Sequence, residues 1–247
     1  MSKKKSDLKI LLLQVRDDQR VRREELKSFA EYSGLAKNQI EILNVFDKPS
    51  FSPDVLSGFD SLFVGGASEA SVLEPEKYPF IKSGEDILLY CIEKEIPVFA
   101  SCFGFQLVVT ALGGEVIRDG KDFEMGSVPI YLTNQAKDDP LFCDTPNGFA
   151  AISVHREKTV NTPPGCQLLA YTDSCHHSFR IKDKPFWAFQ FHPEVDRAIL
   201  IERLTIYKEK YTDNDEHLEK VLSSSSETPE SNILLKKFVD RILLNNE

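Results

Sequence analysis

Two separated segments of the chain carry residue types that can perform nucleophilic chemistry. In residues 96–107 an apolar strand pattern leads directly into a helical pattern, and Cys102 stands at the corner. A cysteine in this position is typical of a nucleophile elbow, whose tight turn requires small neighbours such as Ser101 and Gly104. The N-terminus of the following helix offers free N–H groups and a positive dipole end, which favour the thiolate. Cys102 is therefore a candidate nucleophile.

A buried cysteine without any chemical role is the alternative, because free cysteine is among the residue types most often found in cores. A base is needed to decide, and His192 ends a second apolar strand pattern. Pro193 favours an extended chain at His192, so Glu194 projects to the same side and can orient the ring. The three side chains predict a Cys-His-Glu triad, with Cys102 as nucleophile, His192 as base and Glu194 as the orienting carboxylate.

Composition limits the function classes that the chain can serve. It has 247 residues, 41% of them hydrophobic, which suits a single α/β domain over residues 1–247. The formal net charge of -9 argues against nucleic acid and against anionic membranes as partners. The apolar run at residues 10–13 is too short for a signal or a membrane span.

The five cysteines are odd in number and never form a C-x-x-C pair, so the sequence predicts neither a disulfide framework nor a zinc ribbon. We therefore expect a cytoplasmic protein. Cys175, His176 and His177 form the one cluster that suggests a metal. Because adjacent side chains of an extended segment point to opposite faces, the two histidines cannot easily share an ion, and we expect no metal.

The elements that must position these residues alternate between strand and helix in the first half of the chain, which is typical of a doubly wound, mostly parallel sheet flanked by helices. We expect strands at residues 8–15, 40–46, 61–64 and 96–101, and helices at 20–32, 84–95 and 105–112. The second half predicts shorter strands that form a smaller antiparallel sheet, at 128–133, 149–154, 167–171, 178–181 and 186–191. The last two strands resemble a hairpin. Helices are expected at 197–211 and 232–244, so we divide the domain into a core of about 8–211 and a C-terminal helical extension at 212–247.

The two chemical segments together resemble one family in order and spacing. Residues 102–106, Cys-Phe-Gly-Phe-Gln, resemble the C-x-G-x-Q elbow of class I glutamine amidotransferases, and residues 192–194 resemble their H-P-E segment. Residues 124–126 resemble the E-x-G element of the family, and residues 154–160 resemble its S-H-x-D-x-V segment. The chain departs from the family at Phe105, where His or Gln is usual, at Ala100-Ser101 and at Glu157, where Asp is usual.

The resemblance implies a flavodoxin-like fold of the glutamine amidotransferase type and a set of binding residues. The backbone N–H groups of Gly66 and Phe103 would hold the oxyanion. Gln106 would contact the glutamate part of the substrate, and Val154 and His155 would line the amino-acid pocket mainly through their main chain. Two positions also permit structural interpretations, since Gly65-Gly66 can be a turn after a strand and Gln106 an ordinary polar helix position.

The implied reaction is hydrolysis of the γ-glutamyl amide of glutamine through a thioester on Cys102, without a metal or an organic cofactor. The resemblance is to stand-alone glutaminase domains of the GMP synthase type, which would supply ammonia to a synthetase partner in trans, and to γ-glutamyl peptidases, which act alone. A non-catalytic regulatory relative is the third hypothesis. The sequence leaves glutamine and γ-glutamyl compounds open as the small-molecule substrate.

Overall fold

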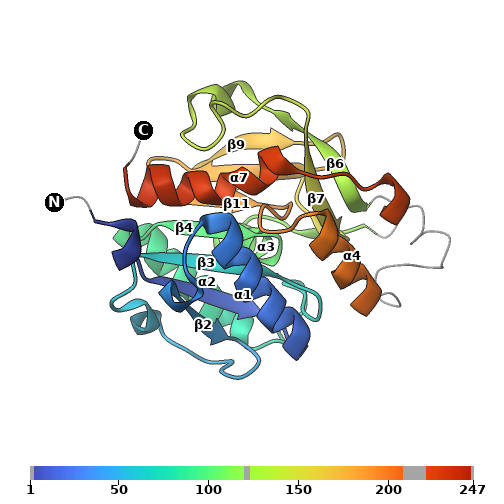
Figure 1. Cartoon of the computed structure of the whole chain (residues 1–247). Helices are drawn as coiled ribbons and strands as arrows, with labels where there is room; N and C mark the ends of the chain where they lie inside the picture. The colour runs from blue at the N-terminus through green and yellow to red at the C-terminus, as the bar shows by residue number, and fades with distance from the viewer. Residues whose placement is uncertain (1–2, 120–122, 208–220, 246–247) are drawn as a thin grey trace.

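The computed structural model describes residues 3–119, 123–207 and 221–245, which form one large sheet with helices on both faces and a second, two-stranded sheet (Figure 1). The described part of the sheet has nine strands. Their order is β2 (Ile40–Asn44), β1 (Ile10–Val15), β3 (Ser61–Ala67), β4 (Val98–Ser101), β11 (Phe186–Phe189), β10 (His176–Ile181), β9 (Cys166–Tyr171), β6 (Glu124–Leu132) and β7 (Phe149–His155).

The half of the sheet from β2 to β11 is parallel, and its inner strands β1, β3, β4 and β11 are mostly apolar and buried on both faces. Every residue of β1 and of β4 is buried, as expected for strands covered by helices on either side. The register pairs Ile10 with both Ile40 and Ser61, and Val98 with Phe186. Since parallel strands end at the same edge of a sheet, the residues that follow β1, β3, β4 and β11 come together there.

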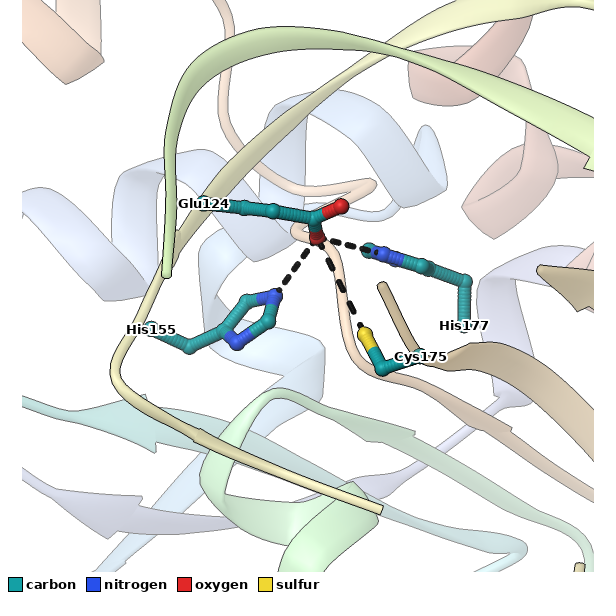
Figure 2. Close-up of side chains that lie close together, drawn as sticks. All are labelled: Glu124, His155, Cys175 and His177. Carbon is teal, nitrogen blue, oxygen red and sulfur yellow. Dashed lines mark hydrogen bonds and ion pairs between the residues drawn. The ribbon is translucent and has the colours of Figure 1, made fainter. Parts of the chain in front are cut away.

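The other half, from β11 to β7, is antiparallel and continues the same sheet. The pairing of β6 with β7 places Glu124 opposite His155, and His177 on β10 reaches the same point (Figure 2). A separate two-stranded antiparallel sheet joins β5 (Ile117–Arg118) to β8 (Glu157–Lys158). Residues from distant parts of the sequence therefore meet on this side of the sheet.

The helices form two layers around this sheet. Helices α2 (Phe80–Lys94) and α3 (Phe103–Ala111) pack together on one face. Helices α1 (Gln19–Ser33) and α7 (Pro229–Lys237) lie side by side on the other, as the blue and red ribbons of Figure 1 show. A π-helical segment, Phe238–Leu243, continues α7, and α4 (Arg197–Ile206) follows the last strand. The expected doubly wound α/β fold with a small antiparallel sheet is thus confirmed, but the strands expected in the small sheet continue the main sheet, and the small sheet is the pair of β5 and β8.

Several element boundaries differ from those expected. Strand β3 continues through Gly65 and Gly66 to Ala67, so these glycines are strand residues and not a turn. Helix α3 begins at Phe103 rather than at residue 105, directly after Cys102. The predicted helix at 197–211 ends at Ile206, and residues 208–211 lie outside the described residues. In the part of the chain that the structure describes, every helix is too short or too polar to cross a membrane.

Candidate active site at the carboxyl edge of the parallel strands

Cys102 occupies a backbone conformation that few residues other than glycine adopt. It is the N-cap of α3, with φ 47° and ψ −95°, and such a conformation costs on the order of 1–3 kcal/mol. Two hydrogen bonds hold it in place: its N–H donates to the Phe189 carbonyl at 2.7 Å, and its carbonyl accepts from the Gln106 N–H at 3.1 Å. The elbow therefore joins β4 to α3, and hydrogen bonds to β11 and within α3 hold its backbone.

Gly104 allows α3 to lie against the sheet directly after this corner. A Cβ atom at Gly104 would lie 2.8 Å from Cβ of Val64 and 3.1 Å from Cβ of Ala100, both of which belong to strands. Such contacts cannot be relieved by a small rotation of a long side chain, so only glycine fits here. The close approach also aims the first N–H groups of α3 toward the edge of the sheet, where they have no partner within the helix.

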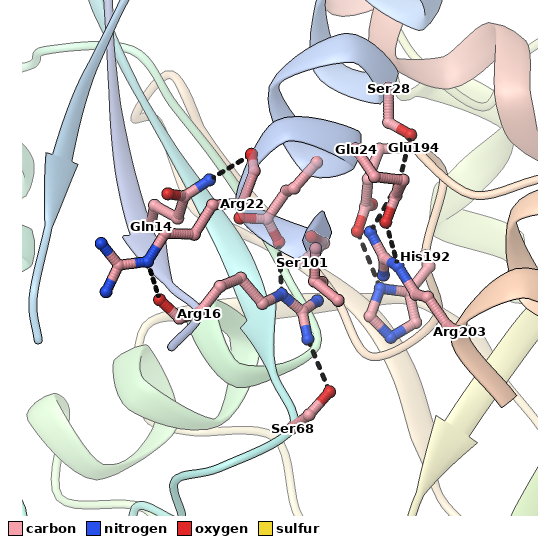
Figure 3. Close-up of polar contacts among 12 residues, drawn as sticks. Gln14, Arg16, Arg22, Glu24, Ser28, Ser68, Ser101, His192, Glu194 and Arg203 are labelled. Atoms are coloured by element: carbon pink, nitrogen blue, oxygen red, sulfur yellow. Dashed lines mark hydrogen bonds and ion pairs between the residues drawn. The ribbon is translucent and has the colours of Figure 1, made fainter. Parts of the chain in front are cut away.

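His192 and Glu194 follow β11 and lie beside Cys102. Nδ1 of the buried His192 ring is 2.7 Å from Oε1 of the fully buried Glu194 (Figure 3). This contact fixes the ring and leaves Nε2 for another partner. Gln190, two residues before His192, donates from Nε2 to the Cys102 sulfur at 3.8 Å. Gln190 was not predicted from the sequence, although a polar residue between Phe189 and Phe191 in a buried segment was a signal.

Gly66 lies between the cysteine and the histidine. A Cβ atom built on it would be 2.7 Å from Cε1 of His192 and 3.5 Å from Cβ of Cys102. The absence of a side chain therefore lets the backbone of β3 approach both residues. The expected oxyanion donors, the N–H groups of Gly66 and Phe103, belong to the two chain segments that meet at Cys102.

The charges around His192 favour its protonated form. Burial alone lowers the pKa of the imidazole, but the Cys102 sulfur and the Glu194 carboxylate raise it to about 9. Burial raises the pKa of Glu194, yet His192 and Arg203 outweigh this and hold it below its usual range. This arrangement suits a thiolate–imidazolium pair. In contrast, burial raises the pKa of the Cys91 and Cys166 thiols to about 12, as suits cysteines with purely structural roles.

A buried ion pair between Arg16 and Glu25 lies beside Gly66, and it was not predicted from the sequence. Arg16, the residue after β1, donates from Nε to Oε1 of Glu25 on α1 at 2.8 Å and from Nη1 to the Ser68 hydroxyl at 2.9 Å (Figure 3). Its Nη2 lies 2.9 Å from the position of a Cβ atom at Gly66. A charged residue at the end of a mostly apolar strand was the available signal.

A cavity of about 360 Å³ opens over Cys102, Phe103 and Gln106, and the segment from Val154 to Glu157 forms its opposite wall. The structure therefore brings Phe103, Gln106, Val154 and His155 to one cavity, while Gly66 is not among its lining residues. Gln106 donates to the Glu157 carbonyl at 2.9 Å and to Oε1 of Gln190 at 3.3 Å, so it ties the helix to this wall. Glu157 itself accepts from Arg118 at 2.6 Å and from Ser71 at 2.6 Å.

The His155 side chain turns away from the substrate cavity. Its Nε2 is 3.0 Å from Oε2 of Glu124, which also lies 2.6 Å from Nε2 of His177. Burial lowers the pKa of His155, against the effect of Glu124. Burial raises the pKa of Glu124, but its contacts with the two histidines outweigh this and hold it well below its usual range. The His155 side chain is 2% exposed and the whole residue 7%, so its exposed atoms belong mostly to the main chain, and their contact with substrate stays a prediction.

Residues 43–199 match the family described as glutamine amidotransferase class-I. One curated relative is a GMP synthase (glutamine-hydrolyzing) of Borrelia garinii subsp. bavariensis, 30% identical over 175 residues, which are 68% of this chain and 31% of the relative. Another is one subunit of a GMP synthase (glutamine-hydrolyzing) of Methanocaldococcus jannaschii, 31% identical over 118 residues, 47% of this chain and 61% of that one. The matched segment is thus less than two thirds of either relative.

Solved structures show the same fold. A glutamine amidotransferase from Thermotoga maritima superimposes with a TM-score of 0.74 and 19% identity. The superposition covers 96% of this chain and 98% of the Thermotoga chain. A glutamine amidotransferase from Methylobacillus flagellatus has a TM-score of 0.69 and 16% identity. This superposition covers 95% of this chain and 94% of the Methylobacillus chain.

Proposed function

Because the chain belongs to the class I glutamine amidotransferase family, we propose that it hydrolyses the γ-glutamyl amide of glutamine through a thioester on Cys102. The observation that carries the proposal is the meeting of three segments at one point. Cys102 is the strained N-cap of α3. A Cβ atom built on Gly66 would lie 3.5 Å from Cβ of Cys102, and Nδ1 of His192 lies 2.7 Å from Oε1 of Glu194. This is the set of groups that acyl transfer requires.

In the first half of the reaction the Cys102 thiolate attacks the amide carbon of glutamine. The carbonyl oxygen becomes negative and accepts hydrogen bonds from the N–H groups of Gly66 and Phe103. His192 then gives its proton to the leaving nitrogen, so ammonia departs and a γ-glutamyl thioester remains. Glu194 holds the ring in the orientation that this transfer needs and stabilises its positive charge.

In the second half, the now neutral His192 removes a proton from a water molecule, which attacks the thioester carbon. Glutamate leaves, and the thiolate–imidazolium pair is restored. Gln106 and the wall at Val154 and His155 line the cavity in which the glutamate part of the substrate would lie.

The leaving group distinguishes two forms of this activity. The cavity continues from Cys102 past Ser68 to Glu74 and Lys77, which leaves room for an amino acid in place of ammonia. The γ-glutamyl peptidase reaction therefore fits the same cavity. If ammonia is the product, we propose a synthetase partner that uses it, since the Methanocaldococcus relative is named as one subunit of a GMP synthase.

We place the activity in the cytoplasm, because all five cysteines are thiols and none is in a disulfide.

The test is an assay of the purified chain with glutamine and, separately, with γ-glutamyl dipeptides. Ammonia from glutamine supports the glutaminase, and release of the second amino acid from a dipeptide supports the peptidase. Cys102→Ala should lower kcat on the order of a million-fold, whereas the exposed Cys143→Ala should keep it. Equal activity of wild type and Cys102→Ala would disprove the mechanism, and a wild type inactive on all these substrates would favour a non-catalytic relative.

A further inference from the structure

Four side chains outside the proposed triad converge on one buried point of the antiparallel half. Glu124 begins β6, His155 ends β7, Cys175 directly precedes β10, and His177 lies on β10 (Figure 2). Oε2 of Glu124 is 2.6 Å from Nε2 of His177, 3.0 Å from Nε2 of His155 and 3.9 Å from Sγ of Cys175. One ligand-type atom from each of the four lies within 4.8 Å of all the others.

Hydrogen bonding alone accounts poorly for this cluster. Both imidazoles direct Nε2 at the same carboxylate oxygen, while the Nδ1 atom of each is buried and has no hydrogen-bond partner among the described residues. In the same part of the chain no lysine or arginine lies within ion-pair distance of Glu124, whose other oxygen accepts from the Thr172 hydroxyl at 2.7 Å. A mostly buried carboxylate, 12% exposed, without a lysine or arginine partner favours a cation from solution.

We propose that Glu124, His155, Cys175 and His177 bind one zinc ion. Two imidazole nitrogens, one thiolate and one carboxylate oxygen are a ligand set that Zn²⁺ accepts, with bonds of about 2.0–2.3 Å in a tetrahedron. Ligand atoms around such an ion are about 3.3–3.8 Å apart, so the contacts of Glu124 with the two histidines must lengthen by about 1 Å or less. The carboxylate and the thiolate together balance the two positive charges of the ion.

This proposal differs from the expectation that no metal binds at residues 175–177. The two adjacent histidines do point apart, as expected, because Nδ1 of His176 contacts the Thr162 hydroxyl at 3.0 Å. Cys175 and His177, two residues apart, share the other face of the segment. The remaining ligands come from β6 and β7, and no spacing within residues 175–177 indicates them.

All four ligands are protein side chains, so the site has the closed form of a structural metal site. The ion would join β6, β7 and β10 at the end of β7, where the main chain of Val154 and His155 forms the wall of the cavity opposite Cys102. Glu124 and Thr172 also line a surface depression with Asp173 and Ser174, and this depression gives the ion a path from solvent. Zinc would thus hold the cavity wall without taking part in bond breaking.

The experiment measures metal binding by the purified full-length chain. The protein is stripped with a chelator, dialysed, and loaded with Zn²⁺, and the bound metal is counted by mass spectrometry and by competition with a chromophoric chelator. We expect one ion per chain. Replacement by Co²⁺ should give the visible bands of a tetrahedral ion and a thiolate-to-cobalt charge-transfer band. Cys175→Ser should remove the charge-transfer band, and His177→Ala should weaken binding beyond the roughly 10- to 100-fold that loss of an outer partner costs.

Three control variants locate the ion. His176→Ala changes the residue between two proposed ligands, Cys166→Ser removes a thiol at the other end of β9, opposite Ile181, and Cys102→Ser removes the buried thiol beside His192. All three should keep one zinc per chain, and circular dichroism confirms that each variant folds. The proposal is wrong if the wild type binds no stoichiometric zinc, or if binding persists in Cys175→Ser and is lost in Cys102→Ser. Because the readout is metal content, its failure leaves the hydrolase proposal intact.

Discussion

At the scale of single residues, the site depends on backbone conformations more than on unusual side chains. Cys102 adopts a positive φ that only the pairing with Phe189 and the start of α3 can impose. Gly66 has no side chain, and this lets β3 approach both Cys102 and His192. The reactive groups are therefore held before any substrate arrives, which is the condition for effective electrostatic stabilisation of an oxyanion.

The charge state of His192 leads to a prediction about pH. Burial lowers its pKa, but the Cys102 sulfur and Glu194 raise it to about 9. The imidazolium should therefore persist above neutral pH and be lost as the pH rises through about 9, and with it the proton that His192 gives to the leaving nitrogen. We expect kcat/KM to fall on the alkaline side near that value, and the pH profile of hydrolysis measures it.

Glu194→Gln is the matched variant for this prediction, because it keeps the shape of the side chain and removes its charge. The alkaline fall in kcat/KM should move to lower pH. A variant whose alkaline limb coincides with that of the wild type would show that Glu194 does not raise the His192 pKa.

At the scale of elements, the pair of Arg16 and Glu25 joins the end of β1 to α1 beneath the site. Both side chains are almost fully buried, at 2% and 0% exposure. Removing one partner leaves the other charge buried and uncompensated. We expect Arg16→Met to lower the free energy of unfolding by about 3–5 kcal/mol, as measured by denaturant titration. Combination with Glu25→Met should recover part of this loss.

An exposed pair provides the control for that titration. Lys82 and Asp86 on α2 are 2.8 Å apart, and their side chains are 74% and 45% exposed. Lys82→Met should change the stability by no more than about 0.5 kcal/mol, as is usual for such pairs on a helix. Equal effects of Lys82→Met and Arg16→Met would contradict a special role for the buried pair.

Elements with a local sequence pattern could be predicted, whereas contacts between distant elements could not. The parallel half was predictable because its strands are contiguous apolar runs, and the elbow because strand, Cys102 and helix are consecutive. Residues 192–194 were recognisable for the same local reason. The contact of Glu124 with His177 depends instead on the pairing of β6, β9 and β10, which no local pattern specifies. Arg16 and Gln190 were missed because their partners come from other elements.

At the scale of the whole molecule, the C-terminal segment is part of the core. The proposed division at residue 211 remains a prediction, but α7 and its π-helical continuation cover the sheet beside α1. Phe238 is fully buried, and its ring contacts Phe63, Phe99 and Trp187. We expect Phe238→Ala to lower the free energy of unfolding by about 3–5 kcal/mol because of the cavity that it leaves. Thermal or denaturant unfolding measures this loss.

Ile233 lies on the same helix and is 46% exposed, which makes it the control. Ile233→Ala should change the stability by about 0.5 kcal/mol or less. If Phe238→Ala were as mild as Ile233→Ala, the last helix would be an appendage and not part of the folding unit.

Gly65 constrains the order in which substitutions can accumulate during evolution. A Cβ atom at Gly65 would lie 2.6 Å from Oε1 of Glu25, which is itself bound to Arg16. Alanine at position 65 therefore becomes tolerable only after position 25 has lost its carboxylate, and that change leaves a buried arginine without its main counter-charge. Positions 16, 25 and 65 should thus vary together in descendants of this chain, and single changes at any of them should be rare.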